Sequence, residues 1–122
     1  MSTQAVAPDI LVVEDNELIG MLLRDALEDE GYRVQVVFDG TDGLALLAQR
    51  PVRLIITDLM LPHMDGVTFS QHVRASPATQ GLPIIAVTAA PPPHTSLFNA
   101  VMQKPFSIDA LLELVAELVE AP

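Results

Sequence analysis

Five residues able to do chemistry stand where short apolar segments of this sequence end. Asp58 closes one apolar run, and the acidic pair Glu14 and Asp15 follows another. Thr88 and Lys104 lie at the ends of two more. Carboxylates gathered at one place repel one another unless a proton or a cation is bound, and oxygen ligands at an open site suit a hard ion such as Mg²⁺. With a hydroxyl and an amine alongside, such a group of residues could transfer a phosphoryl group to Asp58 and hold it there.

The apolar runs must be neighbouring strands for these residues to meet. Short, continuous apolar segments bounded by turn residues are typical of strands buried on both faces of a parallel sheet. The sequence predicts strands at 9–13, 33–38, 54–58, 84–88 and 100–103. Helical segments alternate with them, which indicates an α/β fold with helices on both faces of a five-stranded parallel sheet. Right-handed crossovers then place all five carboxyl ends along one edge, where such sheets bind ligands.

The predicted helices carry apolar stripes that should cover the sheet. They are expected at 16–30, 41–49 and 67–75, with a last helix that starts after the N-cap Ser107. The residues predicted to face inward are Ile19, Leu22, Leu23, Ala26 and Leu27, then Leu44, Leu47 and Ala48, and finally Ile108, Leu111, Leu112, Val115, Leu118 and Val119. Leu18 and Met21 lie off the first stripe, so they are either partly buried core residues or an exposed apolar patch.

The segment between the last two strands is unusually short. Residues 89–99 are close to the lower limit of about 10–12 residues for a whole parallel crossover with its helix. Pro91, Pro92 and Pro93 push the residues before them out of the α region, so Ala90 and the first two prolines should be extended. We therefore predict that the fourth crossover helix is missing or reduced to about one turn, since only Pro93 could begin a helix.

Length and composition limit the classes of protein that fit. The 122 residues suffice for one ordinary core, so we expect a disordered tail at 1–8 and a single domain at 9–120, with no further module within this sequence. A net charge of −10 disfavours nucleic acid and anionic membrane surfaces as partners. The chain has no cysteine and no predicted signal peptide or membrane span, so a cytoplasmic protein is expected. Its three scattered histidines lack the spacing of metal ligands.

Four short motifs together resemble the receiver domain of response regulators, the phosphoacceptor of two-component signalling. They are Val12-Val13-Glu14-Asp15-Asn16, Asp58-Leu59-Met60-Leu61-Pro62 with Asp65-Gly66, Val87-Thr88-Ala89, and Lys104-Pro105-Phe106, in the order found in the family. No single motif is specific, but the combination is, and the resemblance covers Asp9 to Glu120. It implies a flavodoxin-like fold with strand order 2-1-3-4-5, of which a family member is a standard example.

The resemblance also implies roles for individual residues. Carried over position by position, it gives a phosphoacceptor at Asp58, a Mg²⁺ site at Glu14, Asp15, Asp58 and the main-chain carbonyl of Met60, a hydroxyl that moves onto the phosphoryl group at Thr88, and its ion-pair partner at Lys104. Mn²⁺ could substitute for Mg²⁺. In this family the peptide bond between the lysine and the following proline is usually cis, which is expected for Lys104-Pro105.

The expected partners are those of a receiver. The phosphoryl donor would be a sensor histidine kinase or a histidine phosphotransfer protein, which could dock on Leu18 and Met21, and a downstream protein target would read the result. The domain is not expected to be an enzyme with a separate substrate, although phosphorylation and dephosphorylation of Asp58 by its own site are expected. In many receivers the crossover helix between the last two strands forms part of the face through which they dimerise. Because this helix is predicted to be missing or short here, we expect a monomer or a dimer through another surface.

The sequence departs from the family pattern at one position, and three rival functions fit it less well. Val101 stands where the family often has an aromatic residue that reports phosphorylation, so the usual aromatic readout is not expected. A flavin-binding electron carrier shares the fold, but Glu14 and Asp15 place negative charge where its phosphate would bind. A hydrolase would usually have a second acid where Met60 stands. A pseudo-receiver that only docks partners would not need the acceptor, acids, threonine and lysine that are all present here.

Overall fold

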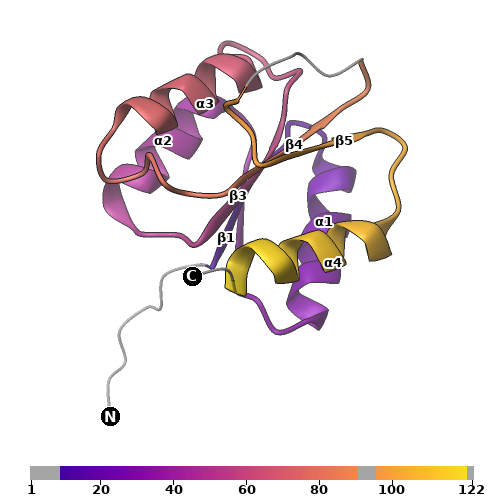
Figure 1. Ribbon diagram of the computed structural model, residues 1–122. Helices are drawn as coiled ribbons and strands as arrows, with labels where there is room; N and C mark the ends of the chain where they lie inside the picture. The colour runs from indigo at the N-terminus through magenta and orange to yellow at the C-terminus, as the bar shows by residue number, and fades with distance from the viewer. Residues whose placement is uncertain (1–8, 91–95, 121–122) are drawn as a thin grey trace.

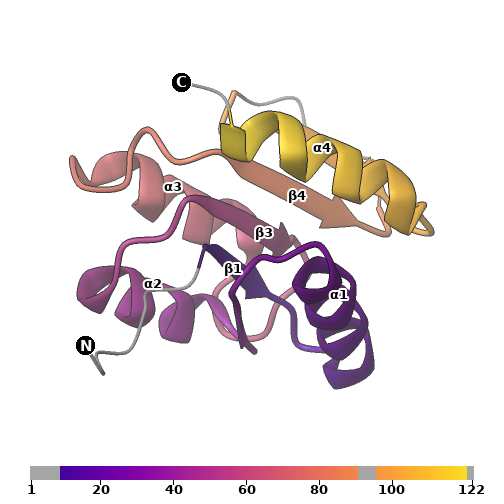
Figure 2. The same ribbon diagram turned by 90° about the horizontal axis from the view of Figure 1, so that it is seen from below.

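A parallel sheet lies between two layers of helices in the computed structural model, which describes residues 9–90 and 96–120 (Figures 1 and 2). The elements in chain order are β1 (Ile10–Val13), α1 (Glu17–Asp29), β2 (Val34–Val37), α2 (Gly40–Gln49), β3 (Leu54–Asp58), α3 (Gly66–Ala75), β4 (Ile84–Thr88), β5 (Ala100–Gln103) and α4 (Ile108–Glu120). Every neighbouring pair of strands is parallel, and the order across the sheet is β2-β1-β3-β4-β5. The predicted α/β fold and strand order are confirmed.

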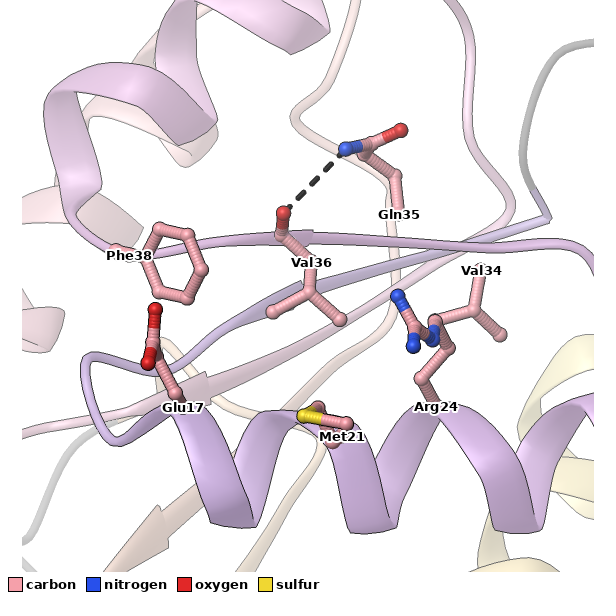
Figure 3. A pocket seen from close by; sticks show the side chains of 7 residues that line it. All are labelled: Glu17, Met21, Arg24, Val34, Gln35, Val36 and Phe38. Carbon is pink, nitrogen blue, oxygen red and sulfur yellow. Dashed lines mark hydrogen bonds between the residues drawn. The ribbon is translucent and has the colours of Figure 1, made fainter.

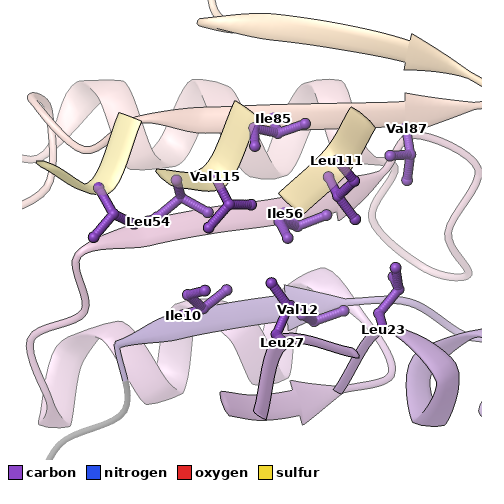
Figure 4. Close-up of a cluster of buried hydrophobic side chains, with 11 residues drawn as sticks. Ile10, Val12, Leu23, Leu27, Leu54, Ile56, Ile85, Val87, Leu111 and Val115 are labelled. Atoms are coloured by element: carbon purple, nitrogen blue, oxygen red, sulfur yellow. The ribbon is translucent and has the colours of Figure 1, made fainter. Parts of the chain in front are cut away.

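Two hydrophobic clusters hold the layers together, because successive residues of a strand point to opposite faces of the sheet. One cluster joins the sheet to α1 and α4 and contains Ile10, Val12, Leu54, Ile56, Ile85 and Val87 together with Leu23, Leu27, Leu111, Val115 and Val119 (Figure 4). The other joins it to α3 and contains Leu11, Val13, Val52, Ile55 and Ile84 together with Phe69 and Val73, with Leu44 and Leu47 of α2 packed against it. The helices therefore cover both faces, as the apolar strands require.

Short polar side chains start the helices. Asn16, Asp39 and Asp65 cap α1, α2 and α3, and in each case the side-chain oxygen accepts the N–H of the residue three positions later, at 3.1, 2.8 and 2.7 Å. The predicted cap Ser107 does the same at 3.2 Å. Gly31 follows α1 with a φ of 96°, a left-handed conformation in which a glycine stops a helix without strain.

Three of the predicted inward-facing residues face solvent instead. Leu22 is 64% exposed and Ile108 is 37% exposed, because both line an open apolar hollow of about 500 Å³ between α1 and the start of α4. Ala48 is also exposed, since α2 turns Leu44 and Leu47 toward the core and leaves Ala48 at the edge of that stripe. These predictions were wrong because a helical period gives the direction of a side chain but not the width of the face that a neighbour covers.

The connection between β4 and β5 differs from the other three connections, each of which contains a helix. In the described parts of this connection, residues 89–90 and 96–99, there is no helix, which agrees with the predicted loss or shortening of the fourth crossover helix. The conformations predicted for Pro91, Pro92 and Pro93 fall outside the described residues. After β5 the peptide bond between Lys104 and Pro105 is cis, as predicted.

Candidate functional site

The carboxyl ends of the strands bring the predicted site residues to one edge of the sheet. Because side chains alternate along strands, Glu14, Asp58 and Lys104 continue the rows that face α1 and α4, while Thr88 continues the opposite row of β4. Carboxylate oxygens of Glu14, Asp15 and Asp58 all lie within 4.8 Å of one another. The clustering of three acids predicted from the strand ends is therefore present in the structure.

Lys104 bridges the two buried acids of this cluster. Its Nζ lies 2.7 Å from Asp58 Oδ2 and 3.1 Å from Glu14 Oε1. The second oxygen of each carboxylate accepts a main-chain N–H, at 2.8 Å from Met60 for Asp58 and at 3.2 Å from Asn16 for Glu14. The side chains of Asp58 and Glu14 are therefore held in fixed orientations by one amine and two amides.

The electrostatics of the site favour a bound cation. Burial raises the pKa of Glu14, and the neighbouring Asp58 raises it further. Burial alone would lower the pKa of Lys104, but hydrogen bonds and ion pairs with Asp58 and Glu14 raise it, so the amine stays charged at neutral pH. Three acids then face one amine. Oxygen-only donors with an excess of negative charge, one of them the exposed Asp15, fit Mg²⁺, which binds through few carboxylates and keeps several waters.

Thr88 lies beside this cluster but is engaged elsewhere. Its side chain is buried, and its hydroxyl accepts the N–H of Ala90 at 3.1 Å, so it holds the first residues after β4. Its main-chain carbonyl accepts the N–H of Lys104 at 2.7 Å, which ties the end of β4 to the end of β5. Thr88 thus contacts both Lys104, which binds the acidic cluster, and Ala90 in the connection that follows β4.

Gly66 is a site residue that the sequence pattern did not single out, although Asp65-Gly66 belonged to a family motif. A Cβ atom at this position would overlap the carbonyl oxygen of Asp58 and lie 2.7 Å from Leu59 Cα. The N–H of Gly66 donates to the carbonyl of Leu59 at 3.0 Å. The absence of a side chain therefore lets the start of α3 approach the main chain that carries Asp58, and only the close approach seen in three dimensions reveals this requirement.

Two hollows flank α1, and they differ in their relation to the site. The hollow between α1 and β2, of about 360 Å³, is lined in part by Glu17, Met21 and Arg24, and Phe38 lies near its Glu17 end (Figure 3). The hollow between α1 and α4 is apolar and includes Lys104 in its lining. Of these two hollows, only the second therefore has a residue of the site in its lining.

The fold and site define a doubly wound α/β domain whose ligand-binding edge carries an acidic cluster and a lysine, and comparison with known proteins gives its family. The sequence model of the response regulator receiver domain family matches residues 10–116, so the chain belongs to this family of two-component signal transduction domains. The chain is 33% identical over 109 residues to a probable chemotaxis protein CheY of Rhizobium etli, with 84% of each chain covered.

Two further similar proteins are a longer regulatory protein, matched over part of its length, and a receiver domain of known structure. The phosphate regulon transcriptional regulatory protein PhoB of Rhizobium meliloti is 42% identical over 82 residues, which are 67% of this chain but 36% of that protein. The chain thus spans about a third of the length of this relative. The receiver domain of the sensor histidine kinase PA1611 of Pseudomonas aeruginosa superposes with a TM-score of 0.85 at 28% identity, covering 95% and 100% of the two chains, and its structure holds a magnesium ion in the active-site cleft.

No helix within residues 9–90 and 96–120 has the length and apolar character needed to span a bilayer.

We expect Glu14→Gln to stabilise the domain in metal-free buffer at neutral pH. The raised pKa of Glu14 means that the folded state disfavours its charged form. The free energy of unfolding is therefore highest below the ordinary pKa of this group, and it falls as the pH rises from that value through the raised pKa of the folded state. A neutral amide of the same shape removes this loss. Thermal unfolding in the presence of a chelator should show a higher midpoint for the variant at pH 7 and a smaller difference in acid. A lower midpoint at pH 7 would contradict the prediction.

Proposed function

We propose that Asp58 accepts a phosphoryl group from a phosphohistidine, in a site where Glu14, Asp15, Asp58 and the main-chain carbonyl of Met60 hold Mg²⁺. The observation that carries this proposal is the cluster of three carboxylates, two of them paired with Lys104, at the ligand-binding edge of the sheet. The magnesium ion would neutralise charge on the phosphoryl oxygens, as in other phosphoryl transfers. The magnesium ion in the PA1611 receiver supports the choice of metal.

The residues of the chain supply the rest of the chemistry. A carboxylate oxygen of Asp58 attacks the phosphorus atom, the bond from phosphorus to the donor nitrogen breaks, and the imidazole leaves with that electron pair. Lys104, now paired with Asp58 at 2.7 Å, would turn to the oxygens of the new phosphoryl group. The Thr88 hydroxyl would donate to one of these oxygens. No separate substrate is turned over, so the protein would act as a phosphorylated switch and hydrolyse its own acyl phosphate.

Intact mass after incubation with acetyl phosphate tests this proposal. Wild type should gain one phosphoryl group with Mg²⁺, and Asp58→Asn should gain none, because an amide is not a nucleophile for this transfer. Chelation should prevent the gain in wild type, and Mn²⁺ in place of Mg²⁺ should restore it. Equal mass gains in wild type and Asp58→Asn, or a gain insensitive to chelator, would overturn the assignment.

We propose a histidine kinase or a histidine phosphotransfer protein as the donor, docked on α1 beside the site. The apolar hollow between α1 and α4 reaches Lys104, and Leu18 and Leu22 are 73% and 64% exposed next to it. A helical surface that buries these leucines would present its histidine to Asp58. Known relatives of this chain include sensor histidine kinases.

Leu22→Glu should separate docking from chemistry. With a histidine kinase that phosphorylates wild type, the variant should accept phosphate at least about tenfold more slowly, since burying an unpaired carboxylate costs more than the 1.4 kcal/mol that this factor represents. Its rate with acetyl phosphate, which needs no docking, should stay the same. Loss of both rates would mean that the substitution damages the site, and loss of neither would contradict docking on this face.

We propose that the signal leaves through Thr88 and Ala90. Phosphorylation adds roughly 1.5 to 2 negative charges and three acceptor oxygens, which can recruit the Thr88 hydroxyl that now accepts the Ala90 N–H. Thr88→Ala should therefore still be phosphorylated, but the amide resonance of Ala90 should respond less to beryllofluoride and Mg²⁺ than in wild type. The same shift changes in both proteins would show that the signal takes another route. We also propose a monomer, or a dimer through a face other than the one that many receivers build from the crossover helix before β5, β5 itself and the last helix.

A further inference from the structure

β5 is the strand least supported by the rest of the fold, although Lys104 follows it directly. It has four residues, Ala100–Gln103, and lies at the end of the sheet with β4 as its one neighbour. The described part of the connection before it contains no helix that could fix its position by packing. A strand of four residues at the edge of a sheet makes few contacts that specify its register. Something else must set where β5 begins.

Asn99, the residue before β5, binds both polar groups of Ile84, the first residue of β4. The N–H of Asn99 donates to the Ile84 carbonyl at 2.8 Å, and the N–H of Ile84 donates to Asn99 Oδ1 at 2.9 Å. This two-point contact fixes the register in which Ala100 lies opposite Ile85. A shift that brought Asn99 opposite Pro83 would leave Oδ1 without a donor there, because proline has no N–H.

Arg74 of α3 holds Asn99 in this position. Its guanidinium donates to Asn99 Oδ1 at 3.0 Å and to the carbonyl of Leu97 at 2.8 and 3.0 Å. The same group donates to the carbonyls of Gln80 and Leu82, which precede β4, at 2.8 and 2.6 Å. One side chain thus ties the entry to β4 and the entry to β5 to the same helix, at the end of the sheet opposite the acidic cluster.

The register of β5 decides on which face Lys104 lies. A shift of one residue moves every side chain of a strand to the other face of the sheet. In the observed register Lys104 faces the acidic cluster, with Nζ 2.7 Å from Asp58. We propose that Asn99 and Arg74 are positioning residues for phosphoryl transfer: by fixing the start of β5 they hold Lys104 against Asp58. This inference rests on the proposed action of Lys104 at the phosphoryl group.

A double-mutant cycle with Lys104→Met tests the proposal, with the rate of phosphorylation by acetyl phosphate at saturating Mg²⁺ as the readout. Asn99→Ala should slow wild type by roughly three- to tenfold, a coupling within the usual range for residues that act together. In the Lys104→Met background the same substitution should change the rate less than about 1.5-fold, since the group it positions is absent. Asn99→Asp, which keeps the acceptor oxygen, should restore the rate to within about twofold of wild type.

Two comparisons separate positioning from general destabilisation. Thr79→Val removes a hydroxyl that donates to the Val73 carbonyl at 2.7 Å, near Arg74 but without contact to β5, and should leave the rate unchanged. Arg74→Lys keeps the charge but loses the forked contact with Leu97 and Asn99. If the Asn99→Ala protein does not fold, Arg74→Lys can take its place in the cycle, and it should slow phosphorylation when Lys104 is present but not in the Lys104→Met background.

Each outcome has a distinct meaning. If Lys104→Met alone leaves the rate unchanged, Lys104 does not act at the phosphoryl group, and the positioning proposal is then wrong as well. If Lys104→Met slows the reaction but Asn99→Ala has no effect, or slows both backgrounds equally, the positioning proposal is wrong while the proposed function stands.

Discussion

Gly66→Ala is expected to lower the free energy of unfolding by about 3 kcal/mol, the upper end of the usual cost of overpacking, and to slow phosphorylation of Asp58 at least about 100-fold. The added Cβ atom would overlap the carbonyl oxygen of Asp58 and lie 2.7 Å from Leu59 Cα. Both are main-chain atoms, which cannot turn aside as the end of a side chain can. Either the start of α3 or the end of β3 must move, and the second movement displaces the phosphoacceptor itself.

Gly81→Ala is the matched control for this substitution. Gly81 is exposed, and no heavy atom lies within 4 Å of the position its Cβ would take, so its free energy of unfolding should stay within about 0.5 kcal/mol of wild type. Chemical denaturation followed by circular dichroism, together with intact mass after acetyl phosphate treatment, measures both effects. A Gly66→Ala protein as stable and as readily phosphorylated as wild type would show that the two chain segments do not pack this closely in solution.

The sequence was sufficient to predict the sheet and the edge at which its polar residues meet. Strands buried on both faces leave continuous apolar runs, and right-handed crossovers bring the carboxyl ends of such strands together. Glu14, Asp58 and Lys104 were therefore expected at one edge of the sheet once their runs were recognised as strands, and the structure places Lys104 within 3.1 Å of both acids. The cis bond at Lys104-Pro105 followed from the family resemblance instead.

Features that depend on distances between elements could not be predicted in this way. Leu22 and Ile108 fit the apolar stripes of their helices, yet both line an open hollow. The helical period of each segment gives no information on how far apart α1 and α4 lie, so their exposure could not be predicted. The fit of Gly66 against Asp58 depends on the approach of two main chains. Four of the five hydrogen bonds of Arg74 go to main-chain carbonyls, those of Leu97, Gln80 and Leu82, and a carbonyl is present at every residue whatever its type, so the sequence does not reveal such partners.

Arg74→Met is expected to lower the free energy of unfolding by about 3 kcal/mol, the upper end of the contribution of one hydrogen bond to a charged donor, because the acceptors are exposed or only partly buried and water can replace most of the lost bonds. The guanidinium makes five hydrogen bonds that join α3 to the segments before β4 and β5. Partial burial lowers the pKa of Arg74, as expected for a group drawn away from water, but an arginine stays charged at any ordinary pH. Methionine keeps most of the apolar stem, so the loss reports the head group.

Arg24→Met is the control, since Arg24 lies on α1 with a side chain that is 41% exposed and one weak ion pair to Asp25 at 3.9 Å. An exposed pair of this kind contributes at most about 1 kcal/mol, so this variant should unfold close to wild type in the same denaturation experiment. Amide hydrogen exchange should show where the Arg74→Met loss falls: protection at β5 should decrease more than protection at β1 and β3, because β5 depends on Arg74 through Asn99. If Arg74→Met and Arg24→Met were equally stable, or if protection fell evenly across the sheet, Arg74 would not be the group that holds β5 in position.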